Sequence, residues 1–596
     1  MSEDKKSRAL QVRARAATAQ LEEESWPSLA DTNNGDDQLY ARYEASFTKL
    51  LHHDADGVLS DAGRAEYERM VGALNRCDAD ALAEVKLAAA LPPPGSARRV
   101  LVNPQSAFSF ESSGADVAQL DMPAPPRMSS RAAAAELLEV YGNLLMRDVH
   151  FDDYKSAHGT AAAVADALTE FGGDYSGPQT AKGNVTPRLL FRGVTEGDRT
   201  GPYLSQYLLM PFFPLFPSGC APFVGGLIGV GNLNLDDLVK PQTYVSPASP
   251  ADGGQEFLTT GAEFTEAQNG EIPRLYMAKD YESDPRYIKR GRDLGGLVHV
   301  DSPYEAYYNA LNILVFRGAA GNPAFPYSRS FSGRWISNQA DGHTMGPPDV
   351  YTLMARACVA AFKAAWANKW LAHRRLRPEV MAARVHHSLK SIADLTSATD
   401  RKAWLSDPKK NPYGLHPDLI EKGWSILDAV RKYNLKNNSK SSTLLLPQMY
   451  PEGSPGHPAY PSGHATVAGA CTTVLKAFFD GGAEMPALAA SSNYTGEKGS
   501  VRVNAAGTGL NSYSGALTVG GELDKLASNI AHGRDFGGVH YRSDGDEGIL
   551  LGERVALRLL RDHAATYPEL GFKGFELKLR SGVRVRINQE GVEALG

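Results

Sequence analysis

The sequence predicts a mainly α-helical protein with packed helical bundles, long loops and a small β-hairpin at the C-terminus. Several long segments repeat apolar residues at helical spacing, and stretches rich in Gly and Pro separate them. Only the tail, residues 572–587, alternates apolar residues around a Ser581-Gly582 turn. With 596 residues, the chain is too long for one ordinary core.

Composition divides the chain into four parts. Residues 1–130 are charged and Ala-rich and then broken by prolines, and we expect a helical arm and oligomerisation region there. Residues 131–345 become rich in Gly, Pro, Asn and Tyr, which indicates a helical and loop-rich region that completes the bundle and a pocket wall. Residues 346–565 carry the strongest helical patterns and form the predicted core, and residues 566–596 form the hairpin tail.

Caps and prolines set the expected helix boundaries. Thr160 is a candidate N-cap, and Pro378 is expected to stop the longest helix. The expected helices are Arg131–Arg147, Ala161–Phe171, Asp349–Leu376, Pro417–Tyr433, His464–Phe479, Glu522–Arg534 and Asp544–His563.

The charge balance argues against nucleic acid and membrane partners. The chain has 62 basic and 68 acidic side chains, which gives a net charge of −6 and no bulk attraction to polyanions. The N-terminus lacks the apolar core of a signal peptide. Prolines interrupt the longest apolar run, Tyr207–Gly231, so we do not expect it to span a membrane. By default, a cytoplasmic protein is expected.

Cysteine usage predicts neither a disulfide framework nor a zinc cluster. The cysteines lie far apart in the sequence and form no CxxC pair. They are Cys77, Cys220, Cys358 and Cys471.

Three segments of the predicted core each suit an anion. In the first, Lys369 and Arg377 are eight residues apart, which places them within about 80° of each other around a helix axis. Arg offers a planar fork to oxyanions, and Lys offers a point charge. Alone, the pair is also typical of a solvated basic patch, because Arg374 and Arg375 lie between them.

The second segment is Pro461-Ser462-Gly463-His464, which opens a helix. Free backbone N–H groups at Ser462 and Gly463 would point at a bound anion, assisted by the helix dipole. His464 lies in the first turn, where it can exchange protons with whatever binds. The alternative is a capped helix with an incidental histidine.

The third segment holds Arg534 and His540 on either side of Gly537-Gly538, where the helix must break. Both side chains can therefore turn back towards one point. Asp544 follows four residues later and either orients His540 or caps the next helix. An isolated Arg–His pair of this kind is also found as a purely structural feature.

Taken together, the three segments resemble the signature of the acid phosphatase and vanadium haloperoxidase superfamily. That signature reads Lys, then Arg-Pro, then Pro-Ser-Gly-His, then an Arg with a His six residues later and an Asp four beyond. The resemblance covers about residues 200–545. It is carried by Lys369, Arg377-Pro378, Pro461-Ser462-Gly463-His464, Arg534, His540 and Asp544.

Where the sequence departs from the phosphatase pattern, it resembles the bromoperoxidases of red algae and their cyanobacterial relatives. Gly533 replaces a serine common in phosphatases, and Lys369 lies one residue further from Arg377. The runs Lys369-Trp370, His373–Glu379 and Ala531–Arg534 are very similar to theirs.

This resemblance implies a vanadate cofactor, one per subunit, in the core 346–565, with His540 as the vanadium ligand. The implied hydrogen-bonding residues are Lys369, Arg377, Ser462, Gly463 and Arg534. His464 would accept a proton from hydrogen peroxide, and Lys369 would polarise the activated oxygen, so the implied catalytic residues are His464, Lys369 and His540. Halide would leave as hypohalous acid and halogenate small organic substrates.

Two residues bear on halide choice and point in different directions. His457 matches the histidine of algal bromoperoxidases, which favours bromide, whereas Trp366 matches a tryptophan of fungal chloroperoxidases. The alternative interpretation of Trp366 is core packing. The prediction is bromide and iodide, with chloride as a further option.

The resemblance also implies a homo-oligomer, up to a dodecamer, and a calcium site that we cannot map onto this sequence. A phosphatase with His540 as nucleophile remains the main alternative. A serine hydrolase using Ser462 is disfavoured, because Tyr460 stands where a nucleophile elbow needs glycine.

Overall fold

The computed structural model describes residues 3–22, 32–89, 99–155, 159–212, 239–327, 338–389, 409–437, 442–487 and 495–595, with isolated positions between 399 and 407. Within these ranges it is mainly helical with two small sheets, which confirms the predicted fold class. Residues 213–231 of the predicted apolar run lie outside the described residues. Among the helices that are described, none is long and apolar enough to cross a membrane.

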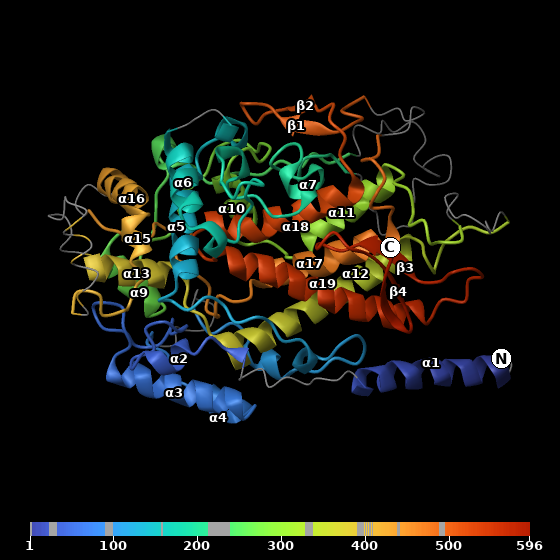
Figure 1. Ribbon diagram of the computed structural model, residues 1–596, viewed down its shortest axis with the longest axis horizontal. Coiled ribbons are helices and arrows are strands. Elements are labelled where there is room, and N and C mark those ends of the chain that lie inside the picture. Colours follow the sequence, from blue (N-terminus) through green and yellow to red (C-terminus); the bar gives the residue numbers. More distant parts are fainter. Residues whose placement is uncertain are drawn as a thin grey trace.

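Four long helices form the centre of the molecule. They are α12 (Pro347–Ala367), α17 (Gly463–Phe478), α18 (Val519–Phe536) and α19 (Arg542–Ala564). Helix α17 packs against the other three, and Figure 1 shows α17, α18 and α19 running across the middle of the molecule. Two prolines open α12, whereas Ser462 and Thr518 cap α17 and α18 through their side-chain oxygens.

Glycines allow α17 and α19 to approach closely. A Cβ atom at Gly469 would lie 2.0 Å from the carbonyl oxygen of Ile549, and one at Gly552 would lie 2.0 Å from that of Thr466. Both distances are far below van der Waals contact, so no larger residue fits without moving a helix. The close approach buries the first turn of α17.

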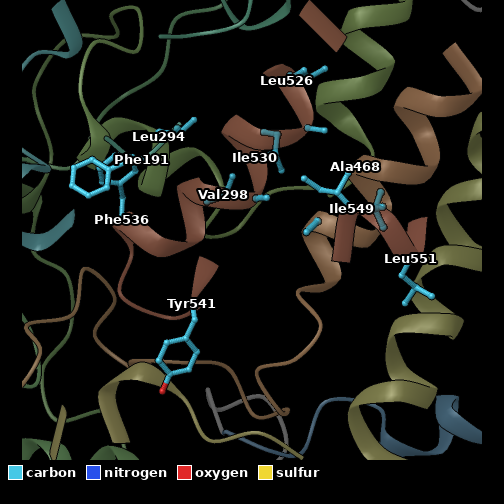
Figure 2. Packing of buried hydrophobic residues seen from close by; sticks show 14 of the residues in the cluster. Phe191, Leu294, Val298, Ala468, Leu526, Ile530, Phe536, Tyr541, Ile549 and Leu551 are labelled. Carbon is cyan, nitrogen blue, oxygen red and sulfur yellow. The ribbon is translucent and has the colours of Figure 1, made fainter. Parts of the chain in front are cut away.

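The apolar core is continuous around these helices. Figure 2 shows Leu526, Ile530 and Phe536 of α18 in one cluster with Val298 and with Ile549 of α19. All five side chains are at most 2% exposed. The loop that carries Val298 is therefore fixed against the bundle.

The remaining helices surround this centre. In Figure 1, α5 and α6 stand across one end of the bundle, and α2 to α4 lie along one side of it. The helices are α1 (Glu3–Glu22), α2 (Asp36–Leu39), α3 (Asp61–Asn75), α4 (Ala79–Ala83), α5 (Arg131–Met146), α6 (Gly159–Thr169), α7 (Glu196–Arg199), α9 (Gly261–Gln268), α10 (Gly291–Leu297), α11 (Glu305–Phe316), α13 (Pro378–Leu389), α15 (Asp418–Glu421) and α16 (Trp424–Asn437).

The predicted helix Asp349–Leu376 is wrong at its C-terminal end. The α-helix ends at Ala367 and continues as one π-helical turn, Asn368–His373. Arg374 then adopts a left-handed conformation with φ 29°, which reverses the chain before α13. Because of this turn, the expected phase relation between Lys369 and Arg377 on one helix does not hold.

Two smaller helix predictions also need correction. The segment Pro417–Tyr433 is two helices, α15 and α16, because the helical pattern is interrupted at Gly423. Helix α6 begins at Gly159, so Thr160 lies inside it and is not its N-cap.

The C-terminal hairpin is confirmed and extended by a third strand. Strands β3 (Phe575–Lys578) and β4 (Arg584–Asn588) pair in antiparallel register, with Leu577 opposite Val585. Strand β5 (Gly591–Ala594) adds to β4 and was not predicted, because four residues carry too little alternation to be recognised. A second small sheet pairs β1 (Val501–Val503) with β2 (Leu510–Ser512).

We expect Gly469→Ala to destabilise the protein by about 1–3 kcal/mol, because its methyl group would force α17 away from α19. Gly72→Ala is the matched control, since a Cβ atom there meets only the end of the flexible Arg76 side chain. That control should be neutral or slightly stabilising, as expected for Gly→Ala within a helix. Thermal unfolding of both variants measures the difference, and equal midpoints would contradict the tight interface.

Candidate active site

Lys369 and Arg377 are both buried, and main-chain carbonyl groups hold them. Lys369 Nζ donates to the carbonyl oxygens of Pro458 at 2.6 Å and Ala459 at 2.9 Å. Arg377 donates to the carbonyl oxygens of His457 at 2.8 Å and Val539 at 2.7 Å. The loop before α17 and the turn before α19 therefore position both cations.

Arg534 completes a set of three buried cations. Its guanidinium donates to the carbonyl oxygen of Val298 and lies 5.5 Å from the ring centroid of Tyr450. Its Nε atom is buried and has no hydrogen-bond partner. Within the described ranges, none of Lys369, Arg377 and Arg534 forms an ion pair with a carboxylate.

The cations repel one another. Burial, together with Arg377 and Arg534, lowers the pKa of Lys369 well below its usual value. Burial and Arg534 lower the pKa of Arg377 to about 9, although Asp544 opposes them. Such excess positive charge in a site of low dielectric is what a multiply charged oxyanion would neutralise.

His540 directs one ring nitrogen towards these cations. Its Nδ1 atom lies 2.9 Å from a carboxylate oxygen of Asp544, and its Nε2 atom lies 3.0 Å from Arg377 Nη1. A carboxylate accepts a proton donor and Arg cannot accept one, so these partners place the proton on Nδ1 and a lone pair on Nε2. Asp544 also accepts from the backbone N–H of Tyr541, so it orients His540 and caps α19 at once.

Ser462 and Gly463 form the first turn of α17, but one predicted donor is not free. The backbone N–H of Ser462 donates to the carbonyl oxygen of Asp544 at 2.8 Å, which corrects the expectation that it points at the anion. The Ser462 hydroxyl accepts from Ala465 and keeps its own hydrogen for donation. Gly463 follows at the first helical position, beside Trp366.

His464 has a carboxylate partner that the sequence did not reveal. Its Nε2 atom lies 2.8 Å from a carboxylate oxygen of Asp301. Although burial favours the neutral acid, His464 and then Arg534 hold the pKa of Asp301 below its usual value. Asp301 is in a loop 163 residues from His464, with no motif around it, so no pattern in the sequence could have identified it.

Trp366 and His457 lie side by side next to Lys369. Their ring centroids are 4.9 Å apart, and Lys369 Nζ lies 5.8 Å from the centroid of Trp366. A Cβ atom at Gly463 would lie 3.0 Å from the indole. The indole Nε1–H donates to Val102, so its ring is fixed in place.

The fold and the site define a helical-bundle protein with three buried cations close to a helix N-terminus, an arrangement that suits an oxyanion. Comparisons with known proteins identify the family to which this helical-bundle protein belongs. Residues 428–567 match the model of the second helical-bundle domain of the VCPO family. The chain is 31% identical to the vanadium-dependent bromoperoxidase of Corallina pilulifera, with 97% of each chain covered. It is 30% identical to that of Ascophyllum nodosum, covering 97% of this chain and 92% of the relative.

A solved structure agrees with the sequence relatives. It is the homohexameric second vanadate-dependent bromoperoxidase of Ascophyllum nodosum, with a TM-score of 0.80, 25% identity, and 99% of this chain and 91% of the other covered. The chain belongs to the vanadium-dependent bromoperoxidase family, and it is therefore an oxidoreductase. The relatives do not favour the phosphatase alternative.

We expect Lys369→Gln to weaken binding of orthovanadate without lowering the thermal midpoint of the ligand-free protein. The amide can still donate to the carbonyl groups, whereas one of three mutually repelling charges is lost. Lys49→Gln is the matched control, because Lys49 is equally buried but paired with Glu379 at 2.8 Å.

Removing Lys49 leaves a buried carboxylate unpaired, so we expect the control to lose about 3–5 kcal/mol of stability. Calorimetry with and without orthovanadate measures both effects. If Lys369→Gln destabilised the ligand-free protein as much as Lys49→Gln, the three cations would not be an uncompensated set.

Proposed function

We propose that this chain uses vanadate to oxidise bromide and iodide with hydrogen peroxide, and that the resulting hypohalous acid halogenates small organic substrates. The observation that supports this proposal is a set of three buried cations that have no carboxylate partner among the described residues and lie close to the unprotonated Nε2 of His540. Family membership supports the same reaction.

The residues present fit vanadate. Its negative charge would offset the repulsion among Lys369, Arg377 and Arg534, and each of these can donate hydrogen bonds to oxygen. The Ser462 hydroxyl and the Gly463 amide add neutral donors, in a first turn where the helix dipole favours anions. His540 Nε2 would bind the metal, because the Asp544 carboxylate fixes the other nitrogen as the donor.

When bound, vanadate supplies a Lewis acid that activates hydrogen peroxide without itself changing oxidation state. His464 accepts a proton from the incoming peroxide at Nδ1, since Asp301 holds Nε2–H. Lys369 would donate a hydrogen bond to the oxygen that halide attacks, and its positive charge would make that oxygen more electrophilic. The carbonyl groups of Pro458 and Ala459 keep the ammonium group in place for this role.

Halide choice depends on Trp366 and His457, whose rings lie against each other beside Lys369. Burial and the neighbouring Lys369 and Arg377 lower the pKa of His457 well below its usual value, so the imidazole is neutral. A neutral imidazole and an indole form a wall that suits a large, weakly hydrated halide. We therefore propose bromide and iodide as the preferred halides, with chloride as a slower substrate.

The vanadate-stripped protein should lack bromoperoxidase activity and regain it on addition of orthovanadate. Bromination of a cyclic diketone in the presence of hydrogen peroxide measures this, with chloride in a parallel reaction. His540→Ala should bind orthovanadate at least about 10-fold more weakly, because the ligand nitrogen is lost. Wild-type protein that takes up vanadate but does not halogenate would overturn the proposal, and hydrolysis of phosphate esters by the stripped protein would become the leading function.

We also propose that the chain assembles into a homo-oligomer. Helix α1 is exposed along most of its length and contacts the body through an ion pair of Arg15 with Glu590, which leaves it available to another subunit. The solved relative is a homohexamer. Light scattering should give six or twelve subunits, and a monomer at micromolar concentration would contradict the proposal.

Calcium is proposed only as an additional ligand, by family resemblance. No group of three or more His, Cys, Asp and Glu side chains in the described part of the chain is arranged to hold a metal ion.

A further inference from the structure

Asp544 is held by an arginine on the side opposite His540. Arg375 Nη1 donates to one oxygen of Asp544 at 2.7 Å, while the other oxygen accepts from His540 at 2.9 Å and from the Tyr541 backbone at 3.1 Å. The Asp544 side chain is fully buried. Each oxygen of the carboxylate thus has a fixed donor, and the plane of the group cannot rotate without breaking a charged hydrogen bond.

Arg375 is itself fixed from three further directions. Its Nη2 donates to Glu136 of α5 at 2.6 Å, and its Nη1 also donates to the Ser543 hydroxyl at 2.9 Å. Its guanidinium carbon lies 4.0 Å from the ring centroid of Tyr541, within the range of a cation–π contact. Glu136 also accepts from the backbone N–H of Ser543 at 2.8 Å. A helix far away in the sequence therefore supports the turn that carries His540.

The same cluster is hydrogen-bonded to the segment before α17. The carbonyl oxygen of Asp544 accepts from Ser462, and that of Arg375 accepts from the backbone N–H of Ala459 at 3.1 Å. Ala459 in turn accepts from Lys369. A change at Arg375 would therefore be transmitted to His540 through the Asp544 side chain, and to Ser462 and Lys369 through the backbone.

We propose that Arg375, supported by Glu136, is a positioning residue that fixes Asp544 and thereby the orientation of His540, so that Nε2 faces the vanadium position. This inference rests on the proposed function, because it assigns a role towards the same cofactor. Lysine cannot replace Arg375, since a single ammonium group cannot span Asp544 and Glu136 with the two parallel donors of a planar guanidinium.

The neighbouring arginine provides a matched control. Arg374 is also buried, and it pairs with Asp37 at 2.9 Å. Its other bonds go to the carbonyl groups of the π-helical turn, at Trp370 and Leu371. Replacing Arg374 therefore removes a buried ion pair of similar kind without touching the Asp544–His540 pair.

The test compares Arg375→Met, Arg375→Lys and Arg374→Met in the full-length oligomer. Titration calorimetry gives the orthovanadate Kd, and solid-state ⁵¹V NMR reports the environment of the bound metal. We expect Arg375→Met to raise the Kd about 10-fold and to shift the ⁵¹V signal, because Asp544, the partner of the ligating histidine, remains but loses the donor that fixes it. Arg375→Lys should recover only a minor part of the affinity. Arg374→Met should lower the thermal midpoint but leave both the Kd and the ⁵¹V signal unchanged.

An Arg375→Met protein with wild-type Kd and ⁵¹V signal would overturn the proposal, as would equal effects on the Kd from Arg374→Met. If Arg375→Met does not fold, Glu136→Gln is the variant that tests the proposal, because it keeps Arg375 and removes only the negative charge of Glu136 that supports it. A raised Kd and a shifted ⁵¹V signal in that variant support the proposal, and unchanged values contradict it. Failure of the wild-type protein to bind orthovanadate would instead refute the proposed function.

Discussion

Repulsion among three buried cations is the constraint on which the rest of the site depends. In the described structure, no carboxylate pairs with Lys369, Arg377 or Arg534. Other interactions must therefore offset the unfavourable energy of holding three buried cations close together. Main-chain carbonyl groups do this, because a carbonyl dipole offsets part of a charge without neutralising it. A carboxylate in the same place would stabilise the protein more and would compete with the anion.

The bundle supplies the stability that this arrangement requires. Gly469 and Gly552 bring α17 and α19 into backbone contact, which helps to bury Ser462 at the N-terminus of α17, where the helix dipole acts. The apolar cluster around Ile530 fixes the Val298 loop, and that loop provides both the acceptor for Arg534 and, three residues later, Asp301. Packing far from the cofactor thus determines where the donors point.

The sequence predicted most of the helices, because helical periodicity is a local signal, and its ordered motif named Lys369, Arg377 and His540, which lie close together in the structure. Prediction from the sequence failed where contacts between distant segments determine the backbone conformation or the partner of a side chain. The π-helical turn after Ala367 and the left-handed Arg374 have no local signature, so Lys369 and Arg377 converge for a different reason from the one expected. Asp301 and Glu136 were missed because their roles arise only from pairing across the fold.

Three neighbouring arginines show that residue type alone does not reveal the role of a buried arginine. Arg374 pairs with Asp37, Arg375 with Asp544 and Glu136, and Arg377 with carbonyl groups and His540. All three are buried and carry the same charge. Of the three, only Arg377 has no ion pair with a carboxylate in the described structure, so its charge remains available to bind an anion. The partner of each arginine, and not its residue type, therefore decides whether it stabilises the fold, orients a ligand or binds one.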